Sequence, residues 1–511
     1  MPRGFSAIVL GAGHNGLVAA NYLARAGAKV LVLERRALVG GACVTEELIP
    51  GFRVSSCAYV CHLLQDKIIE DLDLRRHGLE IYPLAPYRLQ PFPDGRHFLA
   101  WPDDARTLEE IRRLSPEDAE SYPAWTAFWR RASGILHRHF LTDPPALAEV
   151  AASARGTPDE EVLDRMLAGN MKDLVEEHFA SELIRAAFIE AHDAGDVRAP
   201  GSILSVAYIK CNQFTAPANL GIPRGGMGAI TQAMARAARA QGVEIRTGVE
   251  VERIAVRDGR ASGVVAAGEG GIEADVILSN ADPKRTFLRL LDPGALEPAF
   301  LESVRRLKTT VSCLKLHCAL RGLPDFSRYL GEGHDPRHLA QMRICPSVAY
   351  FEQSWEEAKA GRPTSCPVMY VQIPTVYDPT LAPPGQHVMS VWSLYAPVRL
   401  REGTWEAARE RAGEHLIETL ALYAPDIREA IIDWSLFTPW DLERRAYLTD
   451  GNIRHLDIIP QQMWTQRPSY RTPIRGLYLC GAGTHPGGEV TGAPGHNAAR
   501  AALRDWERKP A

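Results

Sequence analysis

The chain has 511 residues, which by length alone suits about three domains with sizeable cores. Its 46% apolar and 23% charged residues are typical of a soluble globular protein, and a net charge of −4 gives no reason to expect a nucleic-acid partner. No apolar run reaches the roughly 18 residues that cross a bilayer. The first apolar run, at residues 5–10, is predicted to be a strand and not the core of a signal peptide. We therefore expect a cytoplasmic protein, with a peripheral membrane contact left open and no oligomeric state indicated.

Residues 5–34 predict a strand, a helix and a second strand. Residues 5–10 are a short apolar run typical of a buried parallel strand, and a helical period that ends on glycine follows. Residues 29–33 form the second strand, with Glu34 at its end. This order is the βαβ unit of dinucleotide-binding folds, in which the terminal acid accepts hydrogen bonds from a ribose 2′-hydroxyl.

The turn before the helix carries the glycine spacing of a nucleotide site. Gly11 permits the tight turn, Gly13 lets a diphosphate approach the backbone, and Gly16 lets the helix pack against the strand. The free N–H groups at the helix start, where His14 and Asn15 lie, favour negative charge. With strand, helix and terminal acid in register, the segment predicts nucleotide binding.

A basic loop with two glycines follows the terminal acid. Arg35, Gly41 and Ala42 suit further contacts with phosphate or ribose, and a plain surface turn is the alternative. Residues 51–64 are semi-polar, and we expect them to line a ligand.

The nine cysteines indicate neither a disulfide framework nor dithiol chemistry. Cys43 lies where flavin disulfide reductases begin a Cys-x4-Cys pair, but Leu48 occupies the second position. Cys313 and Cys318 have the right spacing but lie on a predicted strand. An odd separation there directs two side chains to opposite faces, so these thiols cannot pair.

From about residue 67 to 200 the pattern is mostly helical. Ser115 caps a predicted helix whose first turn carries Pro116. One face of that helix is an aromatic and aliphatic stripe, which either packs into a core or walls an apolar substrate cavity or membrane contact: Tyr122, Trp125, Phe128, Trp129, Leu136 and Phe140. Further on, His192 and Asp193 form a polar pair in an apolar segment. We interpret this pair as substrate-facing or as a buried hydrogen-bonded pair.

Two later regions supply the remaining sheet strands. A glycine turn at 222–228 leads to a helix and strands that return to the first sheet, predicted at 229–241, 243–246, 249–256, 261–267 and 276–281. Alternating segments predict a second sheet that carries a substrate site, at 311–320, 368–374 and 387–395.

The C-terminal region repeats the pattern of strand, glycine loop and helix. Residues 477–480 form the strand, 481–495 the loop and 497–503 the helix. The loop directs backbone N–H groups at an anion, so three separated segments converge on one nucleotide site. A site of that extent suits FAD better than a nicotinamide dinucleotide, and no second strand–GxGxxG–helix predicts a separate NAD(P)H domain.

The predicted fold is α/β, with two discontinuous domains. Residues 1–75, 222–282 and 471–511 would form a Rossmann-type FAD-binding domain. Residues 76–221 and 283–470 would form a substrate domain of mixed sheet and helices.

Several motifs resemble one enzyme family over residues 5 to about 505. GAGHNGLVAANYLARAGAKVLVLERR, GGACVTEELIPGF, PRGGMGAI and LYLCGAGTHPGG are similar to the bacterial phytoene desaturase and retinol saturase superfamily of FAD enzymes. TPWDLERR, GNIRH and EVTGAPGHNAA resemble its branch called pyridine nucleotide-disulphide oxidoreductase domain-containing protein 2. The resemblance implies FAD, hydride transfer from a substrate C–H bond to flavin N5, and reoxidation by oxygen or a quinone.

The same resemblance assigns cofactor contacts. The glycine turn and Glu34 would bind diphosphate and ribose, Arg35 and Gly41 the same half of FAD, and the Val251 backbone the adenine. The C-terminal loop would lie beside the flavin through Gly481, Gly483, Gly488, Glu489, Val490 and Thr491.

Catalytic candidates are fewer, because a flavin itself carries the redox step. His485 and Glu489 flank the C-terminal glycine loop and, with His192, could assist. The alternative is structural, with His485 capping the loop and Glu489 in solvent. No nucleophile elbow, HExxH or clustered Cys/His spacing supports a hydrolase or a metal site.

Three functions follow. The first is an FAD-dependent oxidoreductase that desaturates, saturates or isomerises an apolar small molecule. The second is a flavin amine oxidase, which needs a lysine near flavin N5 (Lys308 or Lys315) and an aromatic cage. The third is a non-catalytic binding protein on the same scaffold, against which the intact glycines and Glu34 argue.

Overall fold

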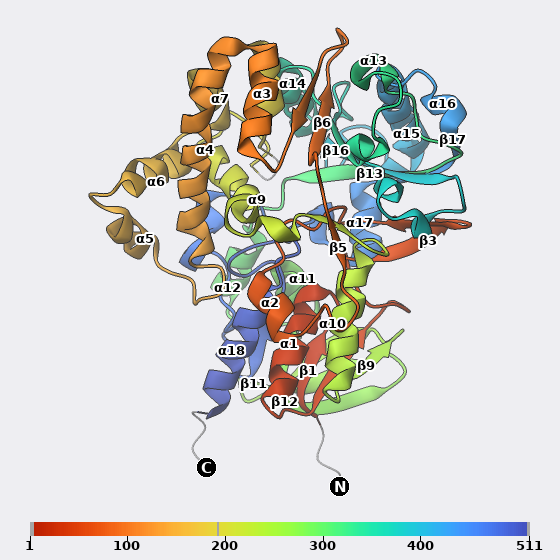
Figure 1. Cartoon of the computed structure of the whole chain (residues 1–511). Helices are drawn as coiled ribbons and strands as arrows, with labels where there is room; N and C mark the ends of the chain where they lie inside the picture. The colour runs from red at the N-terminus through yellow and green to blue at the C-terminus, as the bar shows by residue number, and fades with distance from the viewer. Residues whose placement is uncertain (1–4, 192–193, 508–511) are drawn as a thin grey trace.

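The computed structural model describes residues 5–191 and 194–507 and arranges them around two seven-stranded sheets (Figure 1). The first sheet has the order β10-β11-β12-β1-β2-β9, with β18 beside β12. β1 runs parallel to both neighbours, β2 and β12. The strands are β1 (Phe5–Leu10), β2 (Val30–Glu34), β9 (Glu244–Thr247), β10 (Val251–Arg257), β11 (Arg260–Ala266), β12 (Gly270–Ser279) and β18 (Leu477–Leu479).

β1 is buried on both faces, which explains its continuous apolar sequence. Ala7 and Val9 pack into a core with helices α1, α10 and α18. Ile8 and Leu10 point the other way, into a core with β10, β11, α11 and α12. These helices are α1 (His14–Arg25), α10 (Gly228–Ala240), α11 (Pro283–Arg289), α12 (Pro298–Arg305) and α18 (Ala493–Glu507).

The predicted α/β class and opening βαβ unit are confirmed as β1, α1 and β2. The last helix begins earlier than predicted, at Ala493 instead of residue 497. Pro494 and Gly495 look like loop residues in sequence, yet proline is tolerated in a first helical turn. A Cβ atom on Gly495 would lie 2.0 Å from the Asn15 carbonyl oxygen, so glycine lets α18 pack against α1.

The second sheet has the order β17-β13-β16-β15-β14-β6-β7 and is antiparallel except where β14 meets β6. The three predicted alternating segments are β13, β15 and β16. Cys313 and Cys318 belong to different cores on opposite faces of β13, as their spacing predicts. The strands are β6 (Arg88–Pro91), β7 (His97–Ala100), β13 (Ser312–Leu320), β14 (Gln341–Ile344), β15 (Val368–Gln372), β16 (His387–Ala396) and β17 (Ile431–Phe437).

Helices cover the second sheet. α4 begins where predicted, and the Ser115 hydroxyl accepts a hydrogen bond from the Asp118 N–H. The stripe on α4 packs into the core, with Trp125 and Trp129 edge to face at 5.4 Å between ring centroids. Its alternative interpretation as a cavity wall is wrong. The helices of this half are α3 (Asp104–Leu114), α4 (Pro116–His137), α5 (Leu147–Ala154), α6 (Pro158–Ala168), α7 (Met171–His178), α8 (Glu182–Phe188), α9 (Ser202–Thr215), α13 (Ser327–Leu330), α14 (Val348–Lys359), α15 (Trp405–Ala421), α16 (Ile427–Ala430) and α17 (Pro439–Ala446).

Small elements connect the two halves. The hairpin β3 (Thr45–Ile49) and β4 (Phe52–Ser55) and the pair β5 (Ile81–Pro83) and β8 (Gly221–Pro223) lie between them, with α2 (Asp66–Asp71). The division into the two predicted domains stays a prediction. In the part of the chain that the structure describes, no helix is long and apolar enough to cross a membrane.

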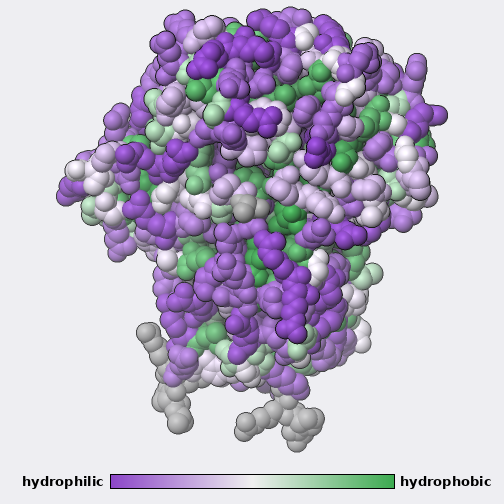
Figure 2. Space-filling model, in the orientation of Figure 1, coloured by the Kyte–Doolittle hydropathy of each residue, from purple (hydrophilic) through white to green (hydrophobic). Residues whose placement is uncertain are grey.

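The face shown in Figure 2 is mostly hydrophilic, and hydrophobic residues gather at the narrow waist between the two halves. Leu422 and Ile432 are the exposed large hydrophobic side chains among the described residues. The predicted peripheral membrane contact stays a prediction.

Candidate functional site

A cavity lies where the carboxyl ends of β1 and β2 face the second sheet, the edge at which parallel α/β sheets bind ligands. Its lining joins the β1–α1 turn to the start of β10, the C-terminal glycine loop and strands β13, β15 and β16. Of the predicted cofactor residues, the lining includes Gly11, Gly13, His14, Asn15, Glu34, Arg35, Gly41, Ala42, Val251, Glu489 and Val490.

The glycine turn leaves the first N–H groups of α1 open to this cavity. Gly13 is the N-cap and has no side chain to accept from them, and the first turn has no acidic residue. Gly41 lies against Gly13, because a Cβ atom on Gly41 would stand 3.3 Å from the Gly13 Cα. Gly16 lies behind the turn, where a Cβ atom would be 2.2 Å from the Gly11 carbonyl oxygen. Gly16 therefore allows the helix to pack against the turn. The uncapped N–H groups at the start of α1 make the surface of the turn suitable for an anion.

Glu34 is held rigidly at the end of β2. Its two carboxylate oxygens accept hydrogen bonds from the N–H groups of Ala12 and Arg36, each at 2.9 Å. The Arg36 guanidinium, also in the lining, pairs with Glu46. Sequence reasoning selected Arg35 and missed Arg36.

Arg35 lines the cavity near Glu34 and contacts the ring of Tyr447, which also lines it. The Arg35 and Arg285 guanidinium carbons each lie 3.6 Å from the centroid of the Tyr447 ring. Arg35 also donates to the Arg444 carbonyl at 2.9 Å. The Tyr447 hydroxyl donates to Glu250 at 2.5 Å, beside β10. The segment after α17 is thereby attached to the first sheet.

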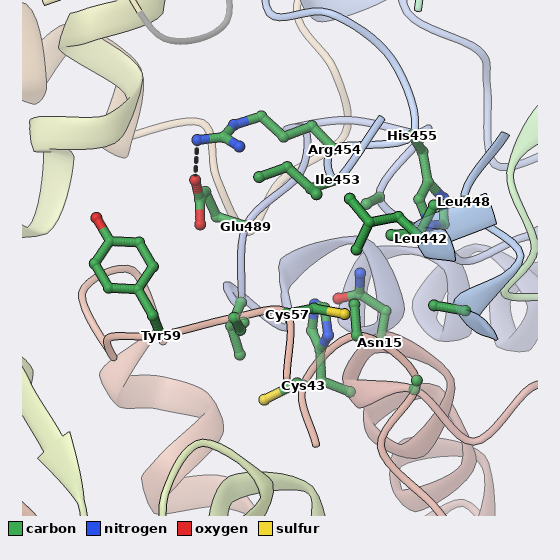
Figure 3. A pocket seen from close by; sticks show the side chains of 18 of the residues that line it. Asn15, Cys43, Cys57, Tyr59, Leu442, Leu448, Ile453, Arg454, His455 and Glu489 are labelled. Carbon is green, nitrogen blue, oxygen red and sulfur yellow. Dashed lines mark ion pairs between the residues drawn. The ribbon is translucent and has the colours of Figure 1, made fainter. Parts of the chain in front are cut away.

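Glu489 is the acidic residue of the C-terminal loop that faces the cavity. Arg454 forms an ion pair with its carboxylate, as Figure 3 shows, and the His62 Nε2 lies 3.8 Å from its other oxygen. The alternative of a solvated Glu489 is therefore wrong.

The other predicted loop residues lie behind this surface. Cβ atoms at three of the glycines would collide with Asn280, Pro283 and Arg454, at 2.7, 2.4 and 2.6 Å for Gly481, Gly483 and Gly488. Thr491 is buried, and its hydroxyl accepts from the Ala493 N–H at the start of α18. These four residues shape the loop from behind.

The structure does not bring His485 to the cavity. Its Nε2 lies 2.8 Å from the carbonyl oxygen of His139, and burial lowers the pKa of the ring to about 4. The predicted catalytic role is therefore replaced by a structural one. His192 lies outside the described residues.

Polar atoms with no hydrogen-bond partner among the described residues collect near the glycine turn. They include His14 Nε2, Asn15 Oδ1 and His455 Nδ1. Burial, together with the neighbouring His455, lowers the pKa of His14 to about 4, and burial also lowers the pKa of His455. Buried polar atoms are normally satisfied, so this set fits a polar ligand at the turn. Together with the open helix start, it fits the diphosphate and ring polar groups of a dinucleotide.

The opposite wall is an aromatic row across the second sheet. Lys315 pairs in register with Trp392, and Trp392 with Tyr370, so the three side chains share one face. The Tyr59 ring lies 5.6 Å from that of Trp392 and 5.0 Å from the Lys315 Nζ. Lys315 is 1% exposed, its Nζ makes no hydrogen bond within the described chain, and burial lowers its pKa to about 8. Lys308 does not reach this cavity lining.

The thiol near the glycine turn is buried. The Cys43 thiol donates to the Met227 carbonyl at 3.2 Å, and burial raises its pKa well above the usual range. A thiolate is the reactive form, so this environment opposes redox exchange.

Some of the missed residues had a signal in the sequence. Arg454 and His455 lie in GNIRH, a motif that supported the family resemblance without any assigned role. Tyr59, Trp392 and Tyr447 carry no local signal, because pairings between distant segments place them here.

The fold and the cavity define a dinucleotide-binding α/β protein of the flavin-enzyme type. The model for the family "Flavin containing amine oxidoreductase" matches residues 16–503, so the chain belongs to that family. The mouse protein named pyridine nucleotide-disulfide oxidoreductase domain-containing protein 2 is 33% identical, over 98% of this chain and 94% of its own length. A limonene dehydrogenase chain of Castellaniella defragrans is 31% identical, over 98% of this chain and 94% of its own.

Phytoene desaturase (neurosporene-forming) of Rhodobacter capsulatus is 27% identical, over 95% of this chain and 91% of its own. Among solved structures, cyclohexylamine oxidase from Brevibacterium oxydans has a TM-score of 0.62 at 16% identity, over 99% of this chain and 100% of that one. This structural likeness shows the shared fold. The resemblance inferred from the motifs is confirmed.

Proposed function

We propose that this protein is an FAD-dependent oxidoreductase that removes or adds hydrogen, or shifts a double bond, on a largely apolar small molecule. The observation that carries the proposal is the single cavity that joins the glycine turn to the aromatic row of the second sheet. A cofactor held at the turn and a substrate held at the row would then share one cavity. Two relatives are named for acting on limonene and phytoene, which supports an apolar substrate.

Different residues of the chain would hold the cofactor and the substrate. The backbone of Gly11 and Gly13 and the start of α1 would hold the diphosphate, with Glu34 on the ribose. Glu489, fixed by Arg454, would stand beside the ring system. Bound FAD would supply the hydride acceptor for this chemistry, and oxygen or a quinone would restore the oxidised flavin. The aromatic wall would orient the substrate and exclude water.

A flavin amine oxidase is the second candidate, favoured by Lys315 and its aromatic neighbours. The buried Lys315 Nζ lies 5.0 Å from the Tyr59 ring, and Trp392 stands beside both. These groups supply the lysine and the aromatic side chains that such an interpretation needs. The family name agrees with it.

The test is anaerobic stopped-flow reduction of the purified holoprotein. A yellow protein with a flavin spectrum excludes a non-catalytic scaffold. We expect an apolar substrate to bleach the flavin band, with oxygen or a quinone restoring the colour. Bleaching by hydrocarbon alcohols or acids supports the first candidate, and bleaching by amines alone supports the second. Rapid saturable bleaching by NADPH alone would contradict both, because only one dinucleotide fingerprint is present.

A further inference from the structure

The side of the cavity away from the glycine turn carries excess positive charge. Four charged side chains line it in the described chain, three cations against one carboxylate: Arg88, Lys210, Lys315 and Glu190. Glu489 lies beside His14 of the turn, and its ion pair with Arg454 adds no net charge. The cations outnumber the carboxylates by two, on side chains that are buried or partly buried. A positively charged substrate would be repelled there, and an acid would be attracted.

Among the described residues, one cluster in this lining has two cations for a single acid. Glu190 lies 3.1 Å from an Arg88 Nη1 and 3.2 Å from the Lys210 Nζ. Arg88 and Glu190 are 7% and 5% exposed, and the Arg88 Nε has no hydrogen-bond partner within the described residues. Within the described residues, this one carboxylate therefore faces two cations. Burial lowers the pKa of Lys210, the direction expected for an ammonium that is incompletely compensated.

The rest of this wall is apolar and aromatic. Tyr59 and Trp392 form one face, with Trp392 next to Tyr370 at 5.1 Å between ring centroids. An aromatic surface beside a buried cationic cluster is complementary to a molecule with an apolar body and an acidic end.

From this arrangement we propose that the substrate carries a carboxylate, which Lys210 binds with the support of Arg88 while the apolar body lies against Tyr59 and Trp392. The proposal rests on the proposed function and names its substrate class. Lys210 is the anchor because its ammonium has three N–H donors and Glu190 takes one of them. Fatty acids and aryl-substituted acids share this chemistry.

The test measures binding to the holoprotein at pH 7 by calorimetry, with three probes of one shape: 4-phenylbutanoate, 4-phenylbutanol and 4-phenylbutylamine. Decanoate in place of the aryl acid separates fatty from aryl acids. We expect the acid to bind about tenfold more tightly than the alcohol or the amine, the range of one charge-assisted hydrogen bond. Equal binding of the three, or tightest binding of the amine, would overturn the proposal.

Variants locate the anchor. Lys210→Met should weaken the acid about tenfold and leave the alcohol within twofold, and Lys210→Arg should keep the preference. Glu190→Gln leaves both cations unopposed and should tighten the acid. The exposed Lys359→Met, on α14, is the matched control without effect. An acid preference that survives in Lys210→Met, or that is lost only in Lys315→Met, would overturn the assignment of Lys210.

Flavin content and flavin reduction are measured on the same samples. A colourless protein that still prefers the acid would contradict the oxidoreductase and leave the acid site standing. A yellow protein that is reduced by amines and does not bind the acid would support the oxidoreductase and contradict the acid site.

Discussion

Replacing Gly13 with alanine or valine should remove FAD without unfolding the protein. Gly13 has φ −70° and ψ 169°, a conformation open to any residue. A Cβ atom there would stand 2.8 Å from the Asn280 Nδ2, the movable end of a side chain that donates only a 3.4 Å hydrogen bond to the Gly11 carbonyl. A small shift of this amide accommodates the methyl group.

The cofactor has no such freedom. A side chain on Gly13 occupies the surface that a diphosphate must reach, next to the open N–H groups of α1. Loss of one hydrogen bond to a charged group costs about 1.5–3 kcal/mol, which is roughly a 10- to 150-fold rise in Kd. Valine, with two more methyl groups, should purify colourless.

The assay is the flavin-to-protein absorbance ratio, followed by titration of apoprotein with FAD while flavin fluorescence is recorded. Gly27→Ala, at the other end of the same helix, is the matched control. Its φ is +86° with open space around it, so alanine costs about 1–2 kcal/mol of backbone strain and should leave FAD affinity unchanged. A Gly13→Val protein with full flavin content and a Kd within twofold of the parent would refute the reasoning.

Three further predictions concern single side chains. Cys43→Ser should leave turnover within about twofold, because its thiol is not poised as a thiolate; loss of activity with FAD still bound would revive a redox thiol. Below about pH 8 the Lys315 ammonium is protonated in both the folded and the unfolded chain. Between pH 8 and 10.5 only the unfolded chain keeps this proton, so the free energy of unfolding rises with pH. Relative to Lys315→Met, the parent should gain up to about 3 kcal/mol across that range. Denaturant melts at pH 7 to 10 check this, and parallel pH profiles would contradict it. Tyr447→Ala should speed FAD release about tenfold, because it removes two cation–π contacts of about 0.5–1 kcal/mol each. Tyr447→Phe keeps the ring, so its release rate should stay within a few-fold of the parent's. Equal release rates for the two variants would contradict a role for the Arg35 and Arg285 contacts with this ring.

The first sheet could be predicted because its signals are local. The run at 5–10, the glycine turn and Glu34 lie within one βαβ unit, and each element's pattern agrees with the next. The strands of the second sheet were also visible, since alternation identifies β13, β15 and β16. Their order across the sheet was not, because strand pairing depends on contacts between distant segments.

The cavity wall was the least predictable part. Helical periodicity showed that α4 has an apolar face but not which part of the protein that face contacts. The aromatic stripe on α4 was therefore compatible with packing into the core and with lining a cavity. Lys315 lies beside Trp392 and Tyr59 only after β13 and β16 pair and residues 51–64 fold over them. Likewise, adjacent Arg35 and Arg36 cannot be distinguished before the loop after β2 is placed.

The buried charged side chains of the cavity do not contribute obviously to the stability of the fold. Replacing a buried ion pair with apolar residues is often neutral or stabilising, and an unpaired buried ammonium such as that of Lys315 is costlier still. Among the described residues, the cluster of Arg88, Lys210 and Glu190 likewise has two cations and one carboxylate. Groups that break the rules of a stable core usually do so for a ligand. Among the described residues on the substrate side of this cavity the excess charge is positive, which is why we propose an anionic substrate there, separate from the diphosphate proposed at the glycine turn.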